Sequence, residues 1–354
     1  MRDMNRRADS ALNGVESEGW PSPFDLETNE WSSGMNEHRF WAERGAQPRL
    51  TYIHYKYANR REGEENQRVN FPFSRSRLIL AAAMMLGDAL TTNNGPAPEA
   101  DEKYGMFDEL KMGAERRANW LGQPVEAPRA LALSSPDLLN GEGVAMNEAF
   151  RAKISSADSR IEFLNEGTPV LKAAARDATA ESFTIALSGI PLSGPDLVLS
   201  FRVKADPMRE LTSDVARRVS VKLETPSVAP EAPKELWTWA GGEWFDARFY
   251  FRSLTGQSAD FTISAEDSGA FYLSDIQAFA HPDALAREFE NGLVLANPGL
   301  APYTFPLDKL YPGKPFRRLK GSPAQDPETN NGQTAGAEVE IEPRDGLFLV
   351  REKR

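Results

Sequence analysis

Carboxyl groups are the side chains of this sequence best suited to acid–base chemistry. The chain has no cysteine and 3 histidines (His38, His54 and His281), whereas aspartate and glutamate together number 52. This composition excludes disulfides, cysteine nucleophiles and thiolate zinc sites, and the histidines are too scattered for a His-x-x-x-His metal motif. Any catalysis by this chain would therefore depend on carboxylates.

Two pairs of carboxylates have positions that suit reactions that need a paired acid and base, of which cleavage of a glycosidic bond is one. Such cleavage needs one carboxyl group that protonates the leaving oxygen and a second that acts as base or nucleophile. Glu16 and Glu18 are two residues apart, so they project to the same side of a predicted strand, and Glu18 is nearer its end. Asp108 and Glu109 follow a loop and begin a predicted helix. We select Glu18, with Asp108 or Glu109, as candidate catalytic residues.

A structural role explains the same carboxylates without catalysis. An Asp-Glu pair at the start of a helix commonly caps it and interacts favourably with the helix dipole. In a chain with a net charge of −11, most carboxylates simply solvate the surface. Both interpretations stay open for Glu16, Glu18, Asp108 and Glu109.

Several further side chains could line a sugar-binding cleft. Tyr52, His54 and Lys56 alternate on one side of a predicted strand, where they would offer hydrogen bonds and a stacking surface. Trp20 and Asn94 lie in loops that follow predicted strands and are further candidates for substrate binding. His54 could equally be an interior histidine with satisfied hydrogen bonds, Lys56 a surface group and Asn94 part of a turn.

The middle of the chain is dense in aromatic residues, namely Trp237, Trp239, Trp244, Tyr250 and Tyr272. Because alternation buries about half of the side chains of a strand, only some of these rings can be exposed. Exposed rings would form a platform for sugars, with Trp244 as the candidate, and buried rings would belong to a structural core.

The elements that position these residues differ along the chain. Residues 1–130 alternate strand and helix signals, which implies parallel strands joined by crossover helices. Residues 131–280 hold eight short alternating strands between turn signals, typical of a β-sandwich or jelly roll. Residues 281–354 hold short strands separated by Gly, Pro and Asn, which predicts a small antiparallel β-domain. The fold class is therefore a multi-domain combination of α/β and all-β parts.

Three segments at the end of the chain carry a family resemblance. They are REFENGLVLANP (287–298), FRRLKGSPAQDPETNNG (316–332) and PRDGLFLV (343–350). Together they resemble the C-terminal β-domain of a group of uncharacterised glycoside hydrolases, in which this domain follows a (β/α)8 barrel of the TIM type. That resemblance implies that the domain packs on a barrel.

Four earlier segments resemble parts of the same barrel. They are LNGVESEGWPSP (12–23), similar to a barrel strand that ends in a glutamate, and RLILAAAMMLGDAL (77–90), KYGMFDEL (103–110) and WLGQP (120–124), similar to the last barrel units. A complete barrel needs eight strand–helix units and about 250 residues, whereas residues 1–130 have room for only the later units. We therefore expect a partial barrel that lacks its N-terminal segment, and that segment is a candidate partner.

The middle region resembles a carbohydrate-binding module. EWFDARFYFR (243–252) and SGAFYLSDIQAF (268–279) look like the closing strands of such a jelly roll. Asp275 resembles the aspartate that many such modules place near a structural calcium, but one carboxylate is far from the roughly six or more oxygens that calcium takes. No cofactor and no metal site are therefore predicted.

The composition also limits the possible partners. A pI near 5.0 argues against nucleic acid and against an anionic membrane surface, and no run of 18 apolar residues predicts a membrane span. The charged first residues predict no signal peptide in this chain, and a longer N-terminus would make an extracytoplasmic location the expectation.

Carbohydrate is thus the expected ligand. The resemblance implies a glycoside-hydrolase-like protein (EC 3.2.1.-) that hydrolyses O-glycosidic bonds in a poly- or oligosaccharide if the barrel is completed. The alternative is a non-catalytic carbohydrate-binding or structural β-sandwich protein.

Overall fold

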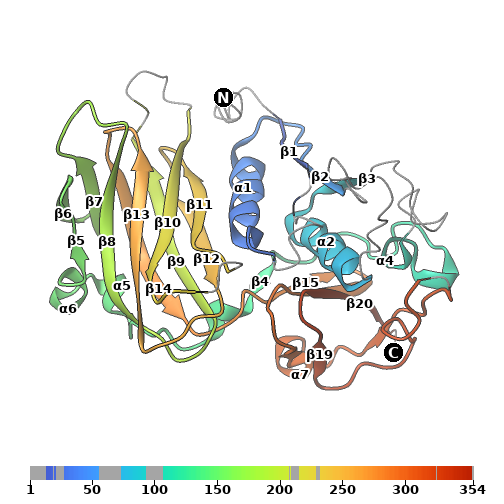
Figure 1. Cartoon of the computed structure of the whole chain (residues 1–354). Coiled ribbons are helices and arrows are strands. Elements are labelled where there is room, and N and C mark those ends of the chain that lie inside the picture. Colours follow the sequence, from blue (N-terminus) through green and yellow to red (C-terminus); the bar gives the residue numbers. More distant parts are fainter. Residues whose placement is uncertain are drawn as a thin grey trace, which may run out of the picture. The chain divides into compact units, whose positions relative to one another are not determined.

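The computed structural model describes residues 13–18, 20, 28–55, 73–92, 107–206, 208, 215–228, 232–323 and 325–352. These residues form two compact units, each assembled from separate stretches of the chain and labelled by element in Figure 1. The sandwich unit draws on Met1–Val15, Asn29–Thr51 and Ala132–Pro282, and the mixed unit on Glu16–Thr28, Tyr52–Leu131 and Asp283–Arg354. Residues before 132 therefore contribute to both units.

Two five-stranded antiparallel sheets form the sandwich unit, and they confirm the β-sandwich that the sequence predicts. On β9 the odd-numbered residues from Leu197 to Ala205 are buried in the core, whereas Ser200, Arg202 and Lys204 lie on the outer face and are partly exposed. The first sheet has the order β11 (Glu235–Ala240), β10 (Arg217–Thr225), β13 (Ser258–Glu266), β8 (Ser182–Pro191) and β5 (Ile154–Ser155). The second sheet has the order β12 (Phe245–Phe251), β9 (Leu197–Ala205), β14 (Phe271–Phe279), β7 (Pro169–Ala175) and β6 (Ser159–Asn165).

Helix α1 (Trp31–Arg44) packs on the edge strands β11 and β12 of the two sheets (Figure 1). Phe40 and Trp41 enter the sandwich core, where the Phe40 ring meets Phe245 with centroids 5.4 Å apart. Edge strands otherwise present unpaired backbone groups. Here the Ser32 and Ser33 hydroxyls accept from the backbone N–H groups of Tyr250 and Trp237 at 2.9 and 3.0 Å. The helix therefore covers the sandwich edge by polar contacts as well as by apolar ones.

A three-stranded parallel sheet opens the mixed unit. It has the order β1 (Glu16–Glu18), β2 (Tyr52–Tyr55) and β3 (Ala89–Thr92), and helix α2 (Phe73–Leu86) lies between β2 and β3 in sequence. This β2–α2–β3 crossover matches the strand–helix alternation expected for residues 1–130. Among the described residues the parallel sheet ends at three strands and no closed barrel is present.

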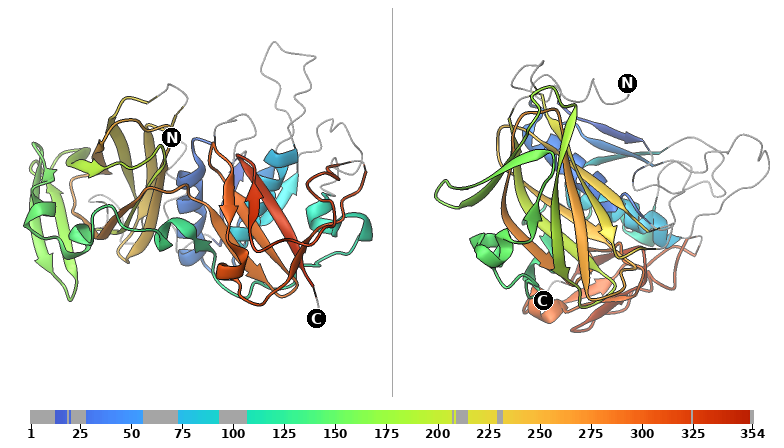
Figure 2. Two further views of the ribbon diagram at one scale, coloured as in Figure 1. Left: turned by 90° about the horizontal axis from the view of Figure 1, so that it is seen from below. Right: turned by 60° about the vertical axis from the view of Figure 1, so that its left-hand side comes forward.

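An antiparallel sheet completes the mixed unit, with the order β18 (Phe316–Arg318), β20 (Asp345–Arg351), β16 (Gly292–Asn297), β15 (Leu285–Phe289) and β4 (Arg129–Ala130). Helix α2 contacts β20, β16 and β15 as well as β2 and β3, as Figure 2 shows in cyan beside the orange and red strands. Contacts on both sides explain why residues 78–83 of α2 are all buried, since a helix that is apolar all round belongs in a core.

Shorter elements connect these parts. In the mixed unit they are α4 (Asp108–Lys111), η3 (Gly113–Glu115), β17 (Tyr303–Phe305), α7 (Leu307–Leu310) and β19 (Val339–Ile341). Residues 131–151 add η4 (Leu131–Ser134), α5 (Glu142–Ala145) and α6 (Glu148–Arg151). The helix predicted to begin at Asp108 and Glu109 is short, because Met112 adopts a left-handed conformation with φ 59° and ends α4. In the part of the chain that the structure describes, no helix is long and apolar enough to cross a membrane.

Candidate functional site

The outer face of the sheet β12–β9–β14–β7–β6 brings two aromatic rings together around a lysine. Trp244 directly precedes β12, Lys204 lies on β9 and Tyr272 on β14, paired with Lys204 in the strand register. The Lys204 Nζ lies 4.8 Å from the centroid of each ring, so the two centroids are at most twice that distance apart, 9.6 Å. Both rings are partly exposed. We use the name aromatic surface for four residues, namely Trp244, Lys204, Tyr272 and Arg202, the last of which also contacts Trp244.

Charged side chains hold these rings in place. Lys204 pairs with Glu166 at 3.0 Å, and the Arg202 guanidinium carbon lies 5.2 Å from the Trp244 centroid. Arg202 also lies 3.5 Å from Asp246 Oδ1 and 3.6 Å from Asp275 Oδ2. Each exposed cation–π contact is worth about 0.5–1 kcal/mol, enough to favour one ring orientation.

The phenol of Tyr272 donates a hydrogen bond and resists ionisation. Its hydroxyl donates to Asp206 Oδ1 at 3.1 Å. Burial, followed by the charge of Asp206, raises the pKa of Tyr272 to about 12. The aromatic surface thus joins two partly exposed rings to hydrogen-bonding groups at their edges, a combination suited to ligands that have both apolar and polar groups.

The other aromatic candidates lie elsewhere. Trp239 and Tyr250 are buried, the former against Trp41 with centroids 5.9 Å apart. Trp237 is partly exposed, lies on the opposite sheet and is contacted by Arg218 at 5.0 Å. Of the aromatic surface, only Trp244 is among the predicted substrate-binding residues. Lys204 and Arg202 are not, although the polar positions 200, 202 and 204 of β9 alternate visibly with apolar ones.

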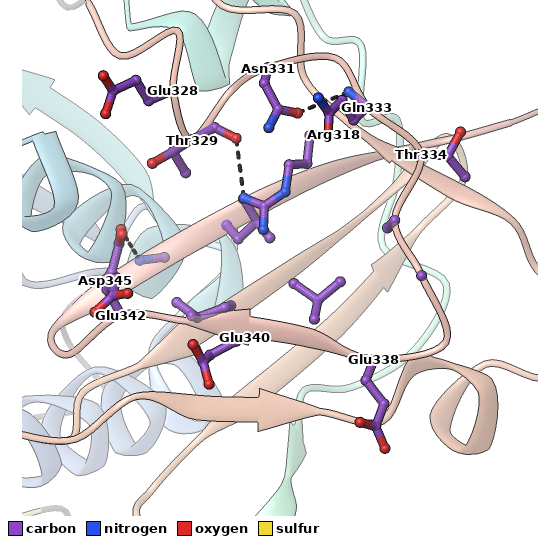
Figure 3. A pocket seen from close by; sticks show the side chains of 16 residues that line it. Arg318, Glu328, Thr329, Asn331, Gln333, Thr334, Glu338, Glu340, Glu342 and Asp345 are labelled. Carbon is purple, nitrogen blue, oxygen red and sulfur yellow. Dashed lines mark hydrogen bonds between the residues drawn. The ribbon is translucent and has the colours of Figure 1, made fainter.

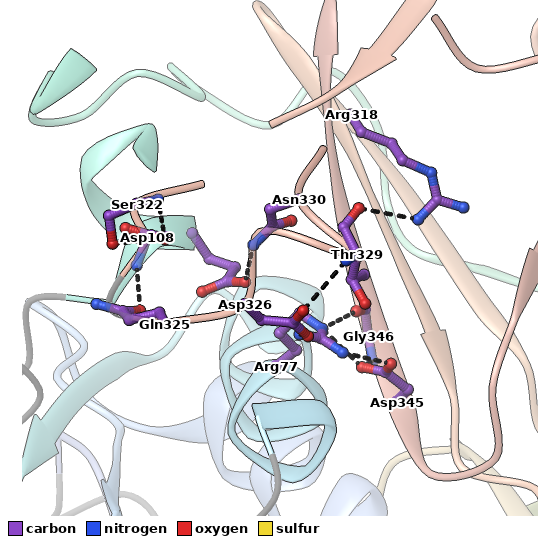
Figure 4. Close-up of polar contacts among 11 residues, drawn as sticks. Arg77, Asp108, Arg318, Ser322, Gln325, Asp326, Thr329, Asn330, Asp345 and Gly346 are labelled. Carbon is purple, nitrogen blue, oxygen red and sulfur yellow. Dashed lines mark hydrogen bonds and ion pairs between the residues drawn. The ribbon is translucent and has the colours of Figure 1, made fainter. Parts of the chain in front are cut away.

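Asp108 and Glu109, the candidate catalytic pair, are buried in the mixed unit, and Figure 4 shows Asp108 beside Ser322. The Asp108 Oδ2 accepts from the Ser322 backbone N–H at 2.7 Å and from its hydroxyl at 3.1 Å. Glu109 Oε1 accepts from the Asn330 Nδ2 at 2.8 Å, and burial raises the pKa of Glu109. These contacts tie α4 to the 319–333 segment, and the two carboxylates are 0% and 4% exposed.

The remaining predicted site residues are only partly described. Glu18 lies on β1, but its side chain, like all of Lys56 and Asn94, lies outside the described residues. Trp20 is buried. Tyr52 and His54 do come together, and they do so around the carboxylate of Glu16.

Buried charge elsewhere in the mixed unit has a structural role. Arg77 of α2 donates to both carboxylate oxygens of Asp345 at 2.9 and 2.7 Å and to Asp326 Oδ2 at 2.5 Å (Figure 4). This network joins α2 to the start of β20 and to the segment before β19. Among the described residues no group of three or more His, Asp or Glu side chains is arranged as a metal site.

A polar cavity of about 530 Å³ lies beside β18 and β19 (Figure 3). Its one arginine, Arg318, donates to the Thr329 carbonyl at 3.1 Å, and Glu338, Glu340 and Glu342 lie along its wall. None of the described residues that line it is aromatic, which distinguishes it from the aromatic surface of the sandwich unit.

Comparison with known proteins gives structural likeness only. No family model and no curated protein matches the chain. Similar solved structures include the CBM22-1 xylan-binding domain from Paenibacillus barcinonensis Xyn10C, 13% identical, covering 41% of this chain and 94% of that chain with a TM-score of 0.30. TmCBM61 in complex with beta-1,4-galactotriose is 13% identical, and the match covers 42% of this chain and 100% of that chain with a TM-score of 0.27. The C-terminal CBM6 of LamC from Zobellia galactanivorans is 16% identical, and the match covers 37% of this chain and 94% of that chain with a TM-score of 0.26. Likeness at this level assigns neither a ligand nor an activity to this chain.

Proposed function

We propose that this protein binds carbohydrate without cleaving it and that the aromatic surface is its binding surface. The observation that carries the proposal is the pair of partly exposed rings, Trp244 and Tyr272, on either side of Lys204. Each ring offers an apolar face to the C–H groups of a pyranose ring. The neighbouring Arg202, Asp246 and Asp275 supply donors and acceptors for its hydroxyl groups.

The spacing of the rings favours an extended glycan. Trp244 directly precedes β12 and Tyr272 lies on β14, the two neighbours of β9 in the sheet. Two strand spacings span roughly 10 Å, and the contacts with Lys204 keep the two ring centroids within 9.6 Å of each other. This is about the length of a disaccharide. We therefore expect an oligosaccharide that lies across the strands, with sugars two positions apart over the two rings.

Affinity electrophoresis on a panel of polysaccharides tests this proposal. At least one polysaccharide should retard the wild type, and Trp244→Ala and Tyr272→Ala should each abolish the retardation. Trp237→Ala is the matched control, because it removes a partly exposed tryptophan from the opposite sheet. Retardation by none of the polysaccharides, or equal retardation of all variants, would refute the proposal.

Hydrolysis by the mixed unit is the second candidate function, and the parallel β2–α2–β3 crossover favours it. In this proposal the unit is the later part of a glycoside hydrolase barrel, and a segment that supplies the other strand–helix units completes it. Asp108 and Glu109 would have to become accessible for a role in catalysis. Release of new reducing ends by the wild type, lost in Asp108→Asn or Glu109→Gln, is the result that would favour hydrolysis.

A further inference from the structure

The parallel sheet of the mixed unit carries a polar cluster that the aromatic surface does not include. The Tyr52 hydroxyl donates to Glu16 Oε2 at 3.0 Å, and the Nδ1 of His54 lies 3.0 Å from Glu16 Oε1. The parallel register pairs Glu16 with Tyr52 and sets His54 two residues further along β2, so both side chains reach one carboxylate from the same face. The carboxylate is therefore held at both of its oxygens.

The described residues on this face of the sheet are all partly or fully exposed. Ile53, between Tyr52 and His54, points the other way and is fully buried, whereas Ala89 and Thr91, their register partners on β3, are exposed. The side chains of His54 and Glu16 are 26% and 40% exposed. Parallel sheets are ordinarily covered on both faces, so an exposed face with a preorganised polar cluster indicates a place for a ligand.

When the His54 ring is neutral, the contact with Glu16 determines which of its two nitrogens carries the proton. An ionised carboxylate can only accept, so Nδ1 must be the donor and Nε2 keeps its lone pair. In the part of the chain that the structure describes, no hydrogen bond reaches this Nε2. A carboxylate that orients an imidazole in this way is the usual support for a histidine that contacts a ligand.

We propose that Glu16, Tyr52 and His54 form a second ligand site, which takes a neutral polyhydroxyl compound such as a saccharide. The free groups of the cluster are the Nε2 of His54, the remaining lone pairs of Glu16 and the phenol oxygen of Tyr52, all of which accept hydrogen bonds. No described lysine or arginine contacts them, and the carboxylate repels anions, so the ligand must bring donors without negative charge. His54 contacts the ligand and Glu16 is its positioning residue. The site belongs to the mixed unit and goes beyond the proposed function of the sandwich unit.

The first test measures the tautomer of His54. Long-range 1H–15N spectra of the full chain labelled with 15N-histidine resolve the rings of its 3 histidines, and His54→Gln identifies the His54 signals. We expect the Nδ1–H form in the wild type and a shift toward the Nε2–H form in Glu16→Ala. Tyr52→Phe keeps the Glu16–His54 contact and should retain the Nδ1–H form. A wild-type ring that is mainly Nε2–H overturns the proposal.

The second test titrates the same labelled protein with cellobiose, maltose and lactose, with glucuronate as the anion and methylamine as the cation. A neutral disaccharide should shift the His54 Nε2 signal, with a Kd about tenfold higher in Glu16→Ala, the loss expected for one oriented hydrogen bond. Trp244→Ala should leave this Kd unchanged, which separates failure of this site from failure of the aromatic surface. If Glu16→Ala does not fold by circular dichroism, Tyr52→Phe provides the comparison, because it keeps the His54 signal, removes the phenol oxygen from the site and should also raise the Kd. A response to glucuronate or methylamine alone, or to none of the probes, overturns the proposal.

Discussion

Surroundings, rather than residue type, separate the carboxylates of this chain. Asp108, Glu109 and Glu16 are all candidates by sequence, yet the first two are buried against the 319–333 segment and the third is 40% exposed between two donors. Sequence analysis ranks Glu18 above Glu16 because Glu18 is nearer the strand end. The contacts of Glu16 with Tyr52 and His54 come from the register of β1 and β2, which pairs residues 36 positions apart.

Because Glu109 is buried, we expect it to make the free energy of unfolding depend on pH. Because its pKa is raised in the folded state, the protonated carboxyl favours folding, and this contribution is lost as the pH rises through the folded-state pKa. Glu109→Gln can still accept from Asn330 and carries no charge. We expect it to gain stability relative to the wild type between about pH 4 and neutrality, by about 1.4 kcal/mol for each unit by which the pKa is raised.

Urea denaturation at several pH values measures this difference. The control is Glu342→Gln, because Glu342 is exposed and its substitution should leave the pH profile unchanged. Parallel profiles for Glu109→Gln and the wild type would contradict the prediction.

The ring of Tyr272, rather than its hydroxyl, should carry most of the binding energy. Tyr272→Phe keeps the aromatic face beside Lys204 and removes only the contact with Asp206, so we expect a loss of about 0.5–1.5 kcal/mol. Tyr272→Ala should cost more. Because the pKa of Tyr272 is raised to about 12, affinity should not change through ionisation of this phenol from neutral pH to about pH 10. Calorimetry with the polysaccharide found by electrophoresis measures both effects, and a fall in affinity near pH 10 that Tyr272→Phe removes would contradict the prediction.

At the scale of elements, α1 shows how a helix protects the edge of a sandwich. Its sequence predicts an amphipathic helix over 29–44 with Trp31, Met35, Phe40 and Trp41 toward a core, and these four residues are buried. The polar residues of the same helix are equally well placed. Asn36 Oδ1 accepts from the Arg248 backbone N–H at 3.1 Å, and its Nδ2 donates to the Arg248 carbonyl at 2.8 Å. Asn36 thus makes the two backbone contacts that a neighbouring strand would make with β12.

Loss of Asn36 should therefore destabilise the sandwich unit. Asn36→Ala removes both partners of Arg248, and we expect a loss of about 2 kcal/mol in the free energy of unfolding. Ser32→Ala removes a single acceptor, that of Tyr250, and should cost about 1 kcal/mol. Urea denaturation followed by tryptophan fluorescence measures both values. A smaller loss for Asn36→Ala than for Ser32→Ala would show that water replaces the asparagine at this edge.

At the scale of the whole molecule, the chain divides into two compact units, each with buried apolar clusters of its own. The sandwich core gathers residues from 40 to 278 and includes Phe40 and Trp41, and a core of the mixed unit gathers residues from 131 to 349. Each core joins stretches that lie far apart in sequence. Independent cores of this kind are expected to unfold as separate cooperative transitions.

Differential scanning calorimetry of paired variants tests this expectation. Asn36→Ala should lower the Tm of the sandwich unit and leave the Tm of the mixed unit unchanged. Arg77→Met should lower the Tm of the mixed unit, because it leaves Asp345 and Asp326 without their buried partner. We expect it to reduce the free energy of unfolding of that unit by about 3–5 kcal/mol. Arg77→Lys keeps the charge but not the paired contacts with Asp345, so it should have an intermediate effect. A single transition that both substitutions shift equally would contradict the prediction.

The sequence by itself determined the features that depend on neighbours along the chain. Alternation of apolar and polar residues identified most sandwich strands, since the side-chain period of a strand is local, but it missed β7, whose three consecutive alanines hide the alternation. Apolar residues at helical spacing identified α1 and α2 but did not indicate what these helices pack against. Only the tertiary structure placed α1 on the sandwich edge, buried Asp108 and Glu109 beneath Ser322 and Asn330, and set Trp244 and Tyr272 around Lys204. Burial and ring spacing are set by strand order and by contacts between residues dozens to hundreds of positions apart, and these long-range pairings leave no periodic mark in the sequence.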